Sequence, residues 1–330
     1  MADVLDLRQF RSSQLESLLA AESVEWSRLL DWDYASSAEL IRQYIDARIL
    51  PGYVLAERMR GRMHPQGYGF FIYEARKGMI GNLFVHPEHR DLHSSLERVL
   101  LRHILDTLRA TPGLERIEAQ LMVFPREALR SSFAGEGFET FARVFLRLPL
   151  DREGNAAPAR NHSRSGLRIE PWGGASLEEA ARLIQHAYQH HVDARINDQY
   201  RTYAGAVRFM HNIAHYPGCG VFDPDSSFIA RSLPQAGLEG MILASRVKND
   251  VAHITQICVS PERQHQGLGG ALLERCLTTL RQQRLRAATL TVTAANSAAC
   301  SLYRQLGFVT LTEFDAHVWE PARPASSEGL

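Results

Sequence analysis

The sequence has few cysteines and no long apolar segment, and both absences narrow the classes of protein it can belong to. Its 330 residues include four cysteines, Cys219, Cys258, Cys276 and Cys300. They lie far apart and form no CxxC pair, which argues against a disulfide framework and a structural zinc site. No apolar run reaches the roughly 18 residues that span a bilayer, and the acidic start of the chain does not resemble a signal peptide. We therefore expect a cytoplasmic protein with no membrane partner.

The sequence also lacks an excess of charge and a metal-binding motif. It has 37 basic and 37 acidic side chains, whereas proteins that bind nucleic acid are usually strongly basic. No nucleic-acid partner is therefore expected. The 14 histidines include no HExxH motif, so no metal site is predicted. The length is typical of two domains.

A polar segment divides the chain. Residues 151–166 are rich in Gly, Pro, Ser and Arg and lack an apolar period, as in an interdomain linker. This predicts domains at 1–150 and 167–320, followed by a loose tail at 321–330. In the second domain the patterns predict strands at 167–169, 227–231, 238–246, 251–259, 288–293, 308–311 and 314–319, and helices at 177–188, 203–214, 267–283 and 297–306.

The first half repeats the order of elements found in the second. Its patterns predict strands at 53–57, 69–74, 79–85, 117–123 and 138–148, and helices at 96–108 and 126–134. Two short strings also recur at matching places. Val85-His-Pro-Glu corresponds to Val259-Ser-Pro-Glu, and Ser132-Phe-Ala-Gly-Glu-Gly-Phe corresponds to Leu302-Tyr-Arg-Gln-Leu-Gly-Phe. An internal duplication accounts for both.

The strongest local signal is a glycine-rich loop that follows the strand ending at Val259. It contains Gly267, Gly269 and Gly270, which lack the Cβ atoms that would keep a ligand from the backbone. The exposed amides and the dipole of a helix that begins in this loop favour an anion, usually a phosphate. The loop fits neither the Rossmann nor the Walker A pattern. On its own, it is equally compatible with a turn that binds nothing.

A second signal is the segment from Asn296 to Phe308. Asn296 stands where a strand gives way to a helix, which is a favourable N-cap position, and Gly307 is suited to end that helix. Tyr303 lies two turns after Asn296. Taken singly, Asn296 indicates only a cap and Tyr303 only a half-buried aromatic side chain.

Together the two signals resemble the acyl-CoA-binding core of the GNAT N-acetyltransferase superfamily. The family carries [QR]xxGx[GA], which corresponds to the segment from Gln264 to Gly269, and then Asn-x-x-Ala-x-x-x-Tyr-x-x-x-Gly-Phe, which corresponds to Asn296 through Phe308. The resemblance implies an α/β (α+β) fold of two tandem GNAT-like domains. Each would contain a mixed, mainly antiparallel, splayed sheet flanked by helices.

The resemblance also implies roles for individual residues. The acyl donor would be acetyl-CoA. It would be bound by Cys258, Val259, Gln264, His265, Gln266, Gly267, Leu268, Gly269, Gly270 and Asn296. Tyr303 would be the general acid that protonates the departing thiolate, since a tyrosine with an ordinary pKa near 10 is protonated at neutral pH. In the family, the region that corresponds to residues 190–200 lines the acceptor site, and a solvated loop is the alternative interpretation of this stretch.

The sequence does not single out a general base. The strands that flank the expected gap carry no carboxylate, and the candidates are His253, Gln256, Asp315, His317 or a chain of waters. Deprotonating a lysine at pH 7 costs about 4.6 kcal/mol, whereas deprotonating an α-amine costs about 1 kcal/mol. We therefore expect an acceptor amine of low pKa, on a small molecule or a protein N-terminus.

The first half has lost the features that carry the chemistry. Its corresponding loop contains no glycine between Val85 and Arg98, and Phe133 stands where the second half has Tyr303. Arg126 stands in place of Asn296. These three changes predict a degenerate copy without catalytic activity, which serves as structure, as a wall of the acceptor site or as a regulatory ligand site.

Three functions compete. The first is an acetyl-CoA-dependent N-acetyltransferase that acts by direct attack of the amine in a ternary complex. The tandem layout also resembles the mycothiol synthase family, which acetylates a cysteinyl amine. A non-catalytic acyl-CoA sensor is the third, although a pure sensor has no need of Tyr303 as an acid. Both a monomer and a homodimer fit the sequence.

Overall fold

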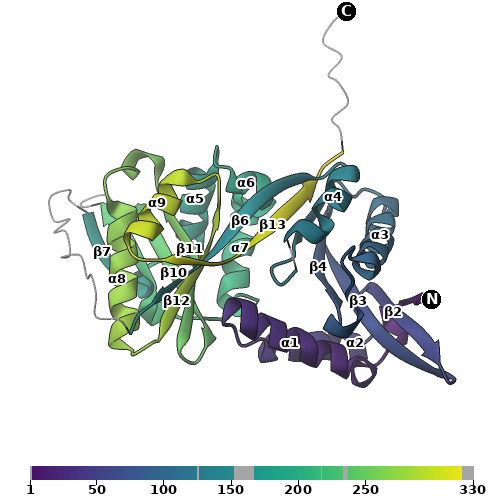
Figure 1. The fold of residues 1–330 in the computed structure, drawn as a ribbon. Coiled ribbons are helices and arrows are strands. Elements are labelled where there is room, and N and C mark those ends of the chain that lie inside the picture. Colours follow the sequence, from purple (N-terminus) through teal and green to yellow (C-terminus); the bar gives the residue numbers. More distant parts are fainter. Residues whose placement is uncertain (1, 125, 152–166, 217, 233–236, 322–330) are drawn as a thin grey trace, which may run out of the picture. The chain divides into compact units, whose positions relative to one another are not determined.

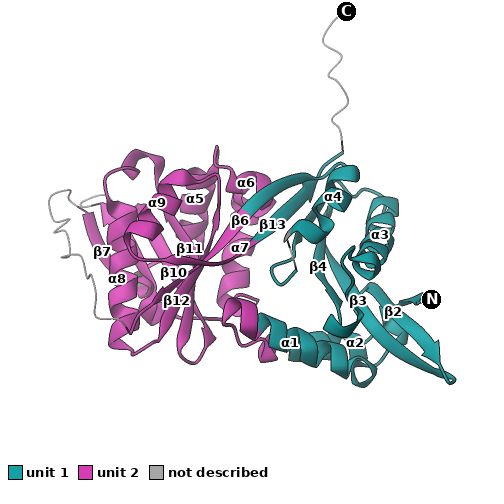
Figure 2. Cartoon of the chain, viewed as in Figure 1, with its two compact units in different colours: residues 1–26, 38–142, 314–330 teal, residues 27–37, 143–313 magenta. Residues whose placement is uncertain are grey.

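The computed structural model describes residues 2–124, 126–151, 167–216, 218–232 and 237–321 (Figure 1). The chain folds into two compact units (Figure 2). The first contains residues 1–26, 38–142 and 314–330, and the second contains residues 27–37 and 143–313. Apart from residues 151 and 321, the predicted linker and tail lie outside the described residues.

The first unit is built on one mixed sheet. Its strands are β1 (Asp3–Asp6), β2 (Gly52–Met59), β3 (Arg62–Glu74), β4 (Lys77–Val85), β5 (Arg116–Gln120) and the end of β13 (Val309–Trp319), in that order. All neighbours are antiparallel except β4 and β5. The apolar faces of α3 (Ser95–Ala110) and α4 (Arg126–Gly135) pack on this sheet in one core. The helices α1 (Glu16–Leu30) and α2 (Ala35–Asp46) precede β2, and the division between the units falls within each of them.

The second unit repeats this plan. Its strands are β7 (Leu167–Pro171), β9 (Phe228–Ser232), β10 (Leu238–Lys248), β11 (Val251–Val259), β12 (Ala287–Thr293) and the end of β6 (Glu139–Pro149), and the short β8 (Val221–Phe222) also pairs with β10. One core contains α8 (Leu268–Gln282) and α9 (Ser297–Gln305), and another contains α5 (Leu177–Tyr188), α6 (Asp193–Ile196) and α7 (Tyr203–His215). The predicted fold class is confirmed.

Each unit is completed by a strand from the other half of the sequence. Residues 143–149 of β6 pair along β12 in the second unit, and residues 316–319 of β13 pair with β5 in the first. The compact units therefore differ in their boundaries from the predicted domains 1–150 and 167–320. The physical reason is that a strand belongs to the sheet with which it forms hydrogen bonds, whatever loop follows it in the sequence.

The sheet of the second unit splits at its middle. The parallel strands β11 and β12 pair only from Val251–Ala287 to Ile254–Leu290, and beyond this point each strand continues without the other. A bulge at Thr255 shifts the register of β11 against β10 at the same level. The two strand ends diverge, and the edge of β11 after Ile254 has no pairing with β12.

Within the described part of the chain, no helix is long and apolar enough to cross a membrane. The same residues contain no group of three or more His, Cys, Asp or Glu side chains that could hold a metal ion.

Candidate functional site

A cavity of about 730 Å³ opens in the second unit where β11 and β12 diverge. Its walls are the end of β11, the end of β12, the loop before α8, one face of α9 and the segment from α5 to the turn at Asp198–Tyr200. All of its lining residues belong to the second unit.

The loop before α8 presents a row of free backbone donors to this cavity. Among the described residues, no acceptor in the chain receives the amide N–H of the six residues from His265 to Gly270. Gly267 occupies the N-cap position with φ of +83°, in the left-handed region that glycine adopts without strain. A Cβ placed on Gly269 would have Val259 Cγ2 at 3.8 Å as its nearest neighbour, so the backbone here is reached without obstruction.

Such a loop is suited to hold a phosphate. Six free N–H groups at the first turn of a 15-residue helix concentrate positive potential, to which the helix dipole adds. Arg263 and His265 also line the cavity. Each hydrogen bond to a charged oxygen contributes about 1.5–3 kcal/mol.

Helix α9 carries the second group of site residues. The Asn296 side chain caps it by accepting the Ala299 amide at 3.1 Å, and Gly307 follows its end with φ of +90°, so both capping predictions are confirmed. Tyr303 lies seven residues after Asn296 and lines the same cavity. Its hydroxyl makes no hydrogen bond to any group in the described ranges, and burial, followed by the charge of Asp193, raises the pKa of Tyr303 above its ordinary value. The phenol therefore stays protonated at neutral pH.

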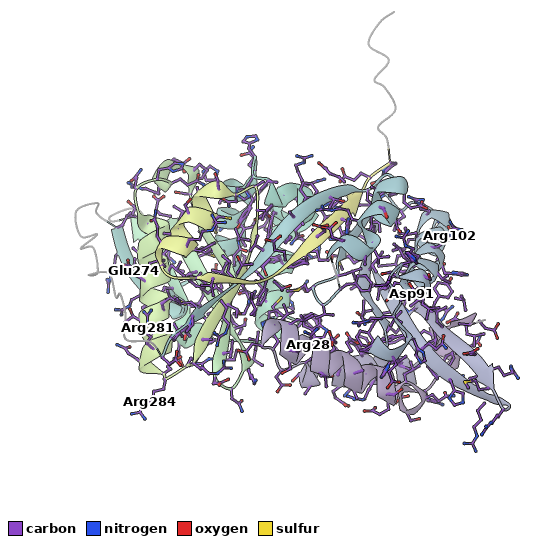
Figure 3. The ribbon with its side chains drawn as sticks, viewed as in Figure 1. Arg28, Asp91, Arg102, Glu274, Arg281 and Arg284 are labelled. Atoms are coloured by element: carbon purple, nitrogen blue, oxygen red, sulfur yellow. The ribbon has the colours of Figure 1, made fainter. Side chains whose placement is uncertain are left out.

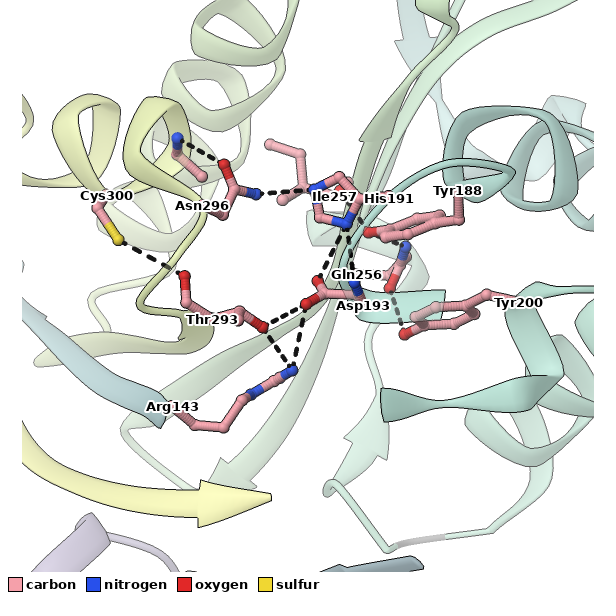
Figure 4. Close-up of polar contacts among 11 residues, drawn as sticks. Arg143, Tyr188, His191, Asp193, Tyr200, Gln256, Ile257, Thr293, Asn296 and Cys300 are labelled. Atoms are coloured by element: carbon pink, nitrogen blue, oxygen red, sulfur yellow. Dashed lines mark hydrogen bonds and ion pairs between the residues drawn. The ribbon is translucent and has the colours of Figure 1, made fainter. Parts of the chain in front are cut away.

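A chain of polar contacts crosses the cavity from α9 to β6 (Figure 4). Asn296 Nδ2 lies 3.1 Å from His191 Nε2, and His191 Nδ1 lies 3.7 Å from Asp193 Oδ2. The other carboxylate oxygen of Asp193 accepts from the Thr293 hydroxyl and lies 3.4 Å from Arg143 Nη1. Arg143 also donates to Thr293 Oγ1 at 3.0 Å.

An aromatic wall stands beside this chain. Gln256 Nε2 donates to the Tyr188 hydroxyl at 2.8 Å, and the Tyr200 hydroxyl donates to Gln256 Oε1 at 3.2 Å (Figure 4). Burial raises the pKa of both tyrosines and raises the pKa of Cys258 to about 12. Cys258 is therefore a neutral thiol at neutral pH, which disfavours it as the nucleophile of an acyl-enzyme pathway.

Most of the residues predicted to bind the acyl donor lie together on the cavity. They are Cys258, Val259, Gln264, His265, Gly267, Leu268, Gly269, Gly270 and Asn296. Gln266 is the exception among them, because its amide turns back to donate to the Glu262 carbonyl at 2.7 Å. The three glycines and Tyr303 face the same space from two different helices.

Of the four acceptor-side candidates, the structure brings only Gln256 to the cavity. His253 is buried between Phe145, Trp32 and Thr289, and burial lowers its pKa to about 3. Asp315 and His317 belong to the first unit. Asp315 pairs there with Arg130, and His317 stacks on Phe133 with a ring distance of 3.8 Å.

The sequence analysis does not single out His191, Asp193 or Arg143. His191 and Asp193 lie in the polar stretch 190–200, which is the signal that was available for them. No comparable signal exists for Arg143, because it reaches the cavity through the pairing of β6 with β12, and that pairing joins residues about 150 positions apart.

Comparison with known proteins agrees with this geometry. Residues 196–308 match the acetyltransferase (GNAT) family. This match spans about a third of the chain and lies within the second unit. A curated GNAT relative, the [ribosomal protein bS18]-alanine N-acetyltransferase of Escherichia coli K12, is 40% identical over 76 residues, which are 23% of this chain and 51% of the relative. The same enzyme of Shigella flexneri matches equally. The chain spans about half the length of these relatives.

Solved structures of GNAT proteins share the fold over nearly the whole chain. A GCN5-related N-acetyltransferase from Sphaerobacter thermophilus superposes with a TM-score of 0.65 at 15% identity, covering 93% of both chains. A tandem GNAT protein from the clavulanic acid biosynthesis pathway gives 0.56 at 17% identity, covering 98% of this chain and 100% of the other. The tandem arrangement of two GNAT folds is therefore confirmed.

Proposed function

We propose that the second unit transfers an acetyl group from acetyl-CoA to an amine by direct attack of the amine nitrogen on the thioester. The observation that carries this proposal is the row of six free amides from His265 to Gly270 at the mouth of a cavity between two diverging strands. The pyrophosphate of a coenzyme A thioester provides the anion that these donors lack, and the free strand end after Ile254 provides backbone partners for its amide-containing arm.

Each group at the cavity then has a definite task. The amides from His265 to Gly270 bind the pyrophosphate, and Cys258 and Val259 orient the thioester through their backbone. Tyr303 gives its proton to the departing sulfur, because its phenol stays neutral and has no partner among the described residues. A positioned acid of this kind contributes about 10²–10⁴ in rate. Alignment of amine and thioester in one cavity supplies a further part of the acceleration.

The acceptor that we favour is the α-amine of a polypeptide N-terminus. The curated relatives act on an alanine of a ribosomal protein. An α-amine also costs only about 1 kcal/mol to deprotonate at pH 7. A small-molecule amine, including a cysteinyl amine, is the second candidate, and the same cavity would bind it.

We further propose that the first unit binds no acyl donor. In its loop, Asp91 Oδ1 accepts the amides of His93 at 2.7 Å and Ser95 at 3.1 Å. Figure 3 labels Asp91 in the first unit. A carboxylate of the chain therefore already occupies the donors that a phosphate would need and repels a second anion. Phe133, which replaces the acid, is fully buried in the core of this unit.

The test is a transfer assay with defined acceptors. The protein is incubated with acetyl-CoA and either an alanine-initiated hexapeptide, its Nα-blocked form with an internal lysine, glucosamine or a cysteinyl glycoside, and release of free thiol is followed. We expect the highest kcat/KM with the free N-terminus. Transfer to the lysine at neutral pH with equal efficiency would contradict a low-pKa acceptor, and transfer to none of these amines would contradict the enzyme proposal.

A further inference from the structure

His191 lies at the centre of the polar chain in the second unit (Figure 4). Its ring has Asn296 on one edge and Asp193 on the other, and the side chain is about 29% exposed, whereas that of Asp193 is 17% exposed. The Oδ1 atom of Asn296 is committed to the Ala299 amide, so its NH₂ group faces His191 Nε2 as a donor. His191 Nε2 is then the nitrogen that carries a lone pair, on the edge of the ring that borders the cavity.

The opposite edge of the ring faces a competing donor and an anion. Asp193 presents both its own amide, 3.2 Å away, and a carboxylate oxygen, 3.7 Å away, to Nδ1. A neutral imidazole accepts at only one nitrogen, so the two approaching N–H groups compete, and the nearby carboxylate favours a proton on Nδ1. A second proton, taken up at Nε2, would create an imidazolium beside that carboxylate.

The other titratable groups around His191 would not neutralise an imidazolium at this position. Tyr188 on α5 lies with its ring centroid 5.1 Å from that of His191. The pKa values of Tyr188, Tyr200, Cys258 and Tyr303 are all raised, which keeps these groups neutral. The remaining charged neighbour is Arg143 on β6, which binds the oxygen of Asp193 that His191 does not face. One carboxylate thus faces Arg143 and His191 through two different oxygens.

We infer that His191 is the proton acceptor for the attacking amine, that Asp193 positions it, and that Arg143 and Thr293 hold Asp193. This inference rests on the proposed acetyl transfer. It also gives the first half of the chain a role in the site, because Arg143 belongs to the strand that ends that half and completes the sheet of the second unit.

Two groups of the chain, His191 and Tyr303, account for both protons that the acceptor nitrogen loses. The ammonium form of the acceptor displaces the Asn296 amide and gives one proton to His191 Nε2, directly or through a water. The freed lone pair forms the C–N bond to the thioester carbonyl, and the C–S bond breaks. Tyr303 protonates the sulfur, and its phenolate then takes the second proton from the new amide nitrogen. His191 releases its proton to solvent, so both groups return to their starting state.

The experiment compares His191→Gln with His190→Gln, a change at the adjacent histidine, which is exposed and does not line the cavity. Acetyl transfer to the alanine-initiated hexapeptide is measured from pH 5.5 to 9.5, and the Kd of acetyl-CoA is measured for each protein. We expect His191→Gln to lower kcat/KM by about 10²-fold at pH 7. It should also change the pH profile, so that the rate rises tenfold per pH unit across the neutral range, while the Kd of acetyl-CoA stays within twofold. His190→Gln should match the wild type.

Asp193→Asn tests the positioning role. Removal of the carboxylate takes away the anion that faces His191 Nδ1, so kcat should fall while KM for the peptide is kept. A His191→Gln protein that keeps the pH profile of the wild type and at least a third of its activity would overturn this inference and leave the transferase proposal standing. A wild-type protein that binds acetyl-CoA but acetylates none of the test amines would overturn both.

Discussion

The loops that precede α3 and α8 begin alike and end differently. Both leave a strand through a Pro-Glu turn, and the residue before each helix has a positive φ, 52° at Ser94 and 83° at Gly267. In the first loop, Asp91 accepts two of the amides, and hydrogen bonds from Ser95, from its side chain first, hold the pKa of Asp91 below its ordinary range. In the second loop the corresponding amides are free. The same backbone trace thus binds an anion of its own chain in one unit and is available to a foreign anion in the other.

The interiors of the two units differ as their loops do, because the first unit fills with its own side chains a space that the second unit leaves open. Phe133 packs against Phe138 and His317, whereas Tyr303, at the corresponding position of the second unit, lines the cavity. At the level of the strand bulge, Phe70 fills the space beside Gly81, because a Cβ there would lie 2.3 Å from its ring. The fold is therefore kept in both units, and we propose the chemistry only for the unit whose gap is left open.

The largest effect should come from deleting the end of β13, the strand with which the second half of the sequence completes the sheet of the first unit. A chain that ends at residue 313 loses residues 316–319 of β13, which pair with β5, and also loses Phe314, which is 1% exposed. We expect the first unit to lose at least about 3 kcal/mol of unfolding free energy. Hydrogen exchange of β4 and β5 measures this, with a chain ending at Pro321 as the control. Unchanged protection of β5 in the shorter chain would show that the first unit does not depend on this strand.

The next largest effect should follow from replacing the proposed acid of the second unit with the phenylalanine that the first unit has at the corresponding position. Tyr303→Phe removes the proton donor and keeps the ring, so kcat should fall by about 10²–10⁴-fold. The Kd of acetyl-CoA should change less than twofold, because the hydroxyl binds no donor group in the proposed complex. Steady-state kinetics and calorimetry measure the two quantities. A loss confined to KM would mean that Tyr303 binds substrate and does not act as the acid.

A smaller effect concerns the buried imidazole of the second unit. Burial lowers the pKa of His253 to about 3, well below the ordinary 6.5 of the unfolded chain, so the unfolded state binds more protons between these values. This contribution to stability is complete above pH 6.5 and is lost as the pH falls toward 3. Between pH 7 and pH 5 it amounts to about 2 kcal/mol.

Urea unfolding of wild type and His253→Asn at both pH values measures this contribution. The variant should be less stable at pH 7 and should lose less stability than the wild type on going to pH 5. Burial lowers the pKa of His317 in the first unit to about 4, so His317→Asn is the matched comparison. The stability that His317 contributes should also be lost as the pH falls, but over a narrower pH range. Equal acid sensitivity of wild type and both variants would show that these imidazoles are protonated without loss of structure.

The smallest effect should come from the reverse change. Phe133→Tyr places a hydroxyl in the first unit at the position of the acid, but Phe133 is fully buried and packs against Phe138 and His317. We expect no gain of transfer, alone or in a Tyr303→Phe background, and a loss of about 1–3 kcal/mol from the crowded core. Recovered activity in the double variant would identify the first unit as a second catalytic centre.

The sequence predicts best what is local. The helix expected at 267–283 spans Leu268–Gln282, the helix expected at 297–306 spans Ser297–Gln305, and the strand expected at 251–259 is found there. Capping by Asn296 and the glycine at 307 follow from neighbouring residues and were predictable for that reason. The two strands expected at 308–311 and 314–319 are one continuous strand, Val309–Trp319.

What the sequence could not predict depends on pairing over long distances. The contacts of Asp193 with Arg143 and Thr293 join positions 50 and 100 residues apart. The placement of His253, Asp315 and His317 away from the cavity depends on which sheet receives β6 and β13, and no local pattern records this. The segment before Tyr53, which forms β1, α1 and α2, also lacked a pattern strong enough to assign.

Calorimetric titration of acetyl-CoA into the intact chain tests the central contrast between the two loops most directly. Wild type is compared with Gly269→Asp, whose carboxylate suits a first helical turn but repels a phosphate, with Gly269→Ala as its neutral control, and with Ser95→Asp at the exposed first residue of α3. We predict one site per chain, weakened at least about 100-fold by Gly269→Asp, weakened less by Gly269→Ala, which adds a Cβ without a charge, and changed less than twofold by Ser95→Asp. Two sites per chain, or a site that is lost in Ser95→Asp and kept in Gly269→Asp, would contradict the assignment of the acyl donor to the second unit.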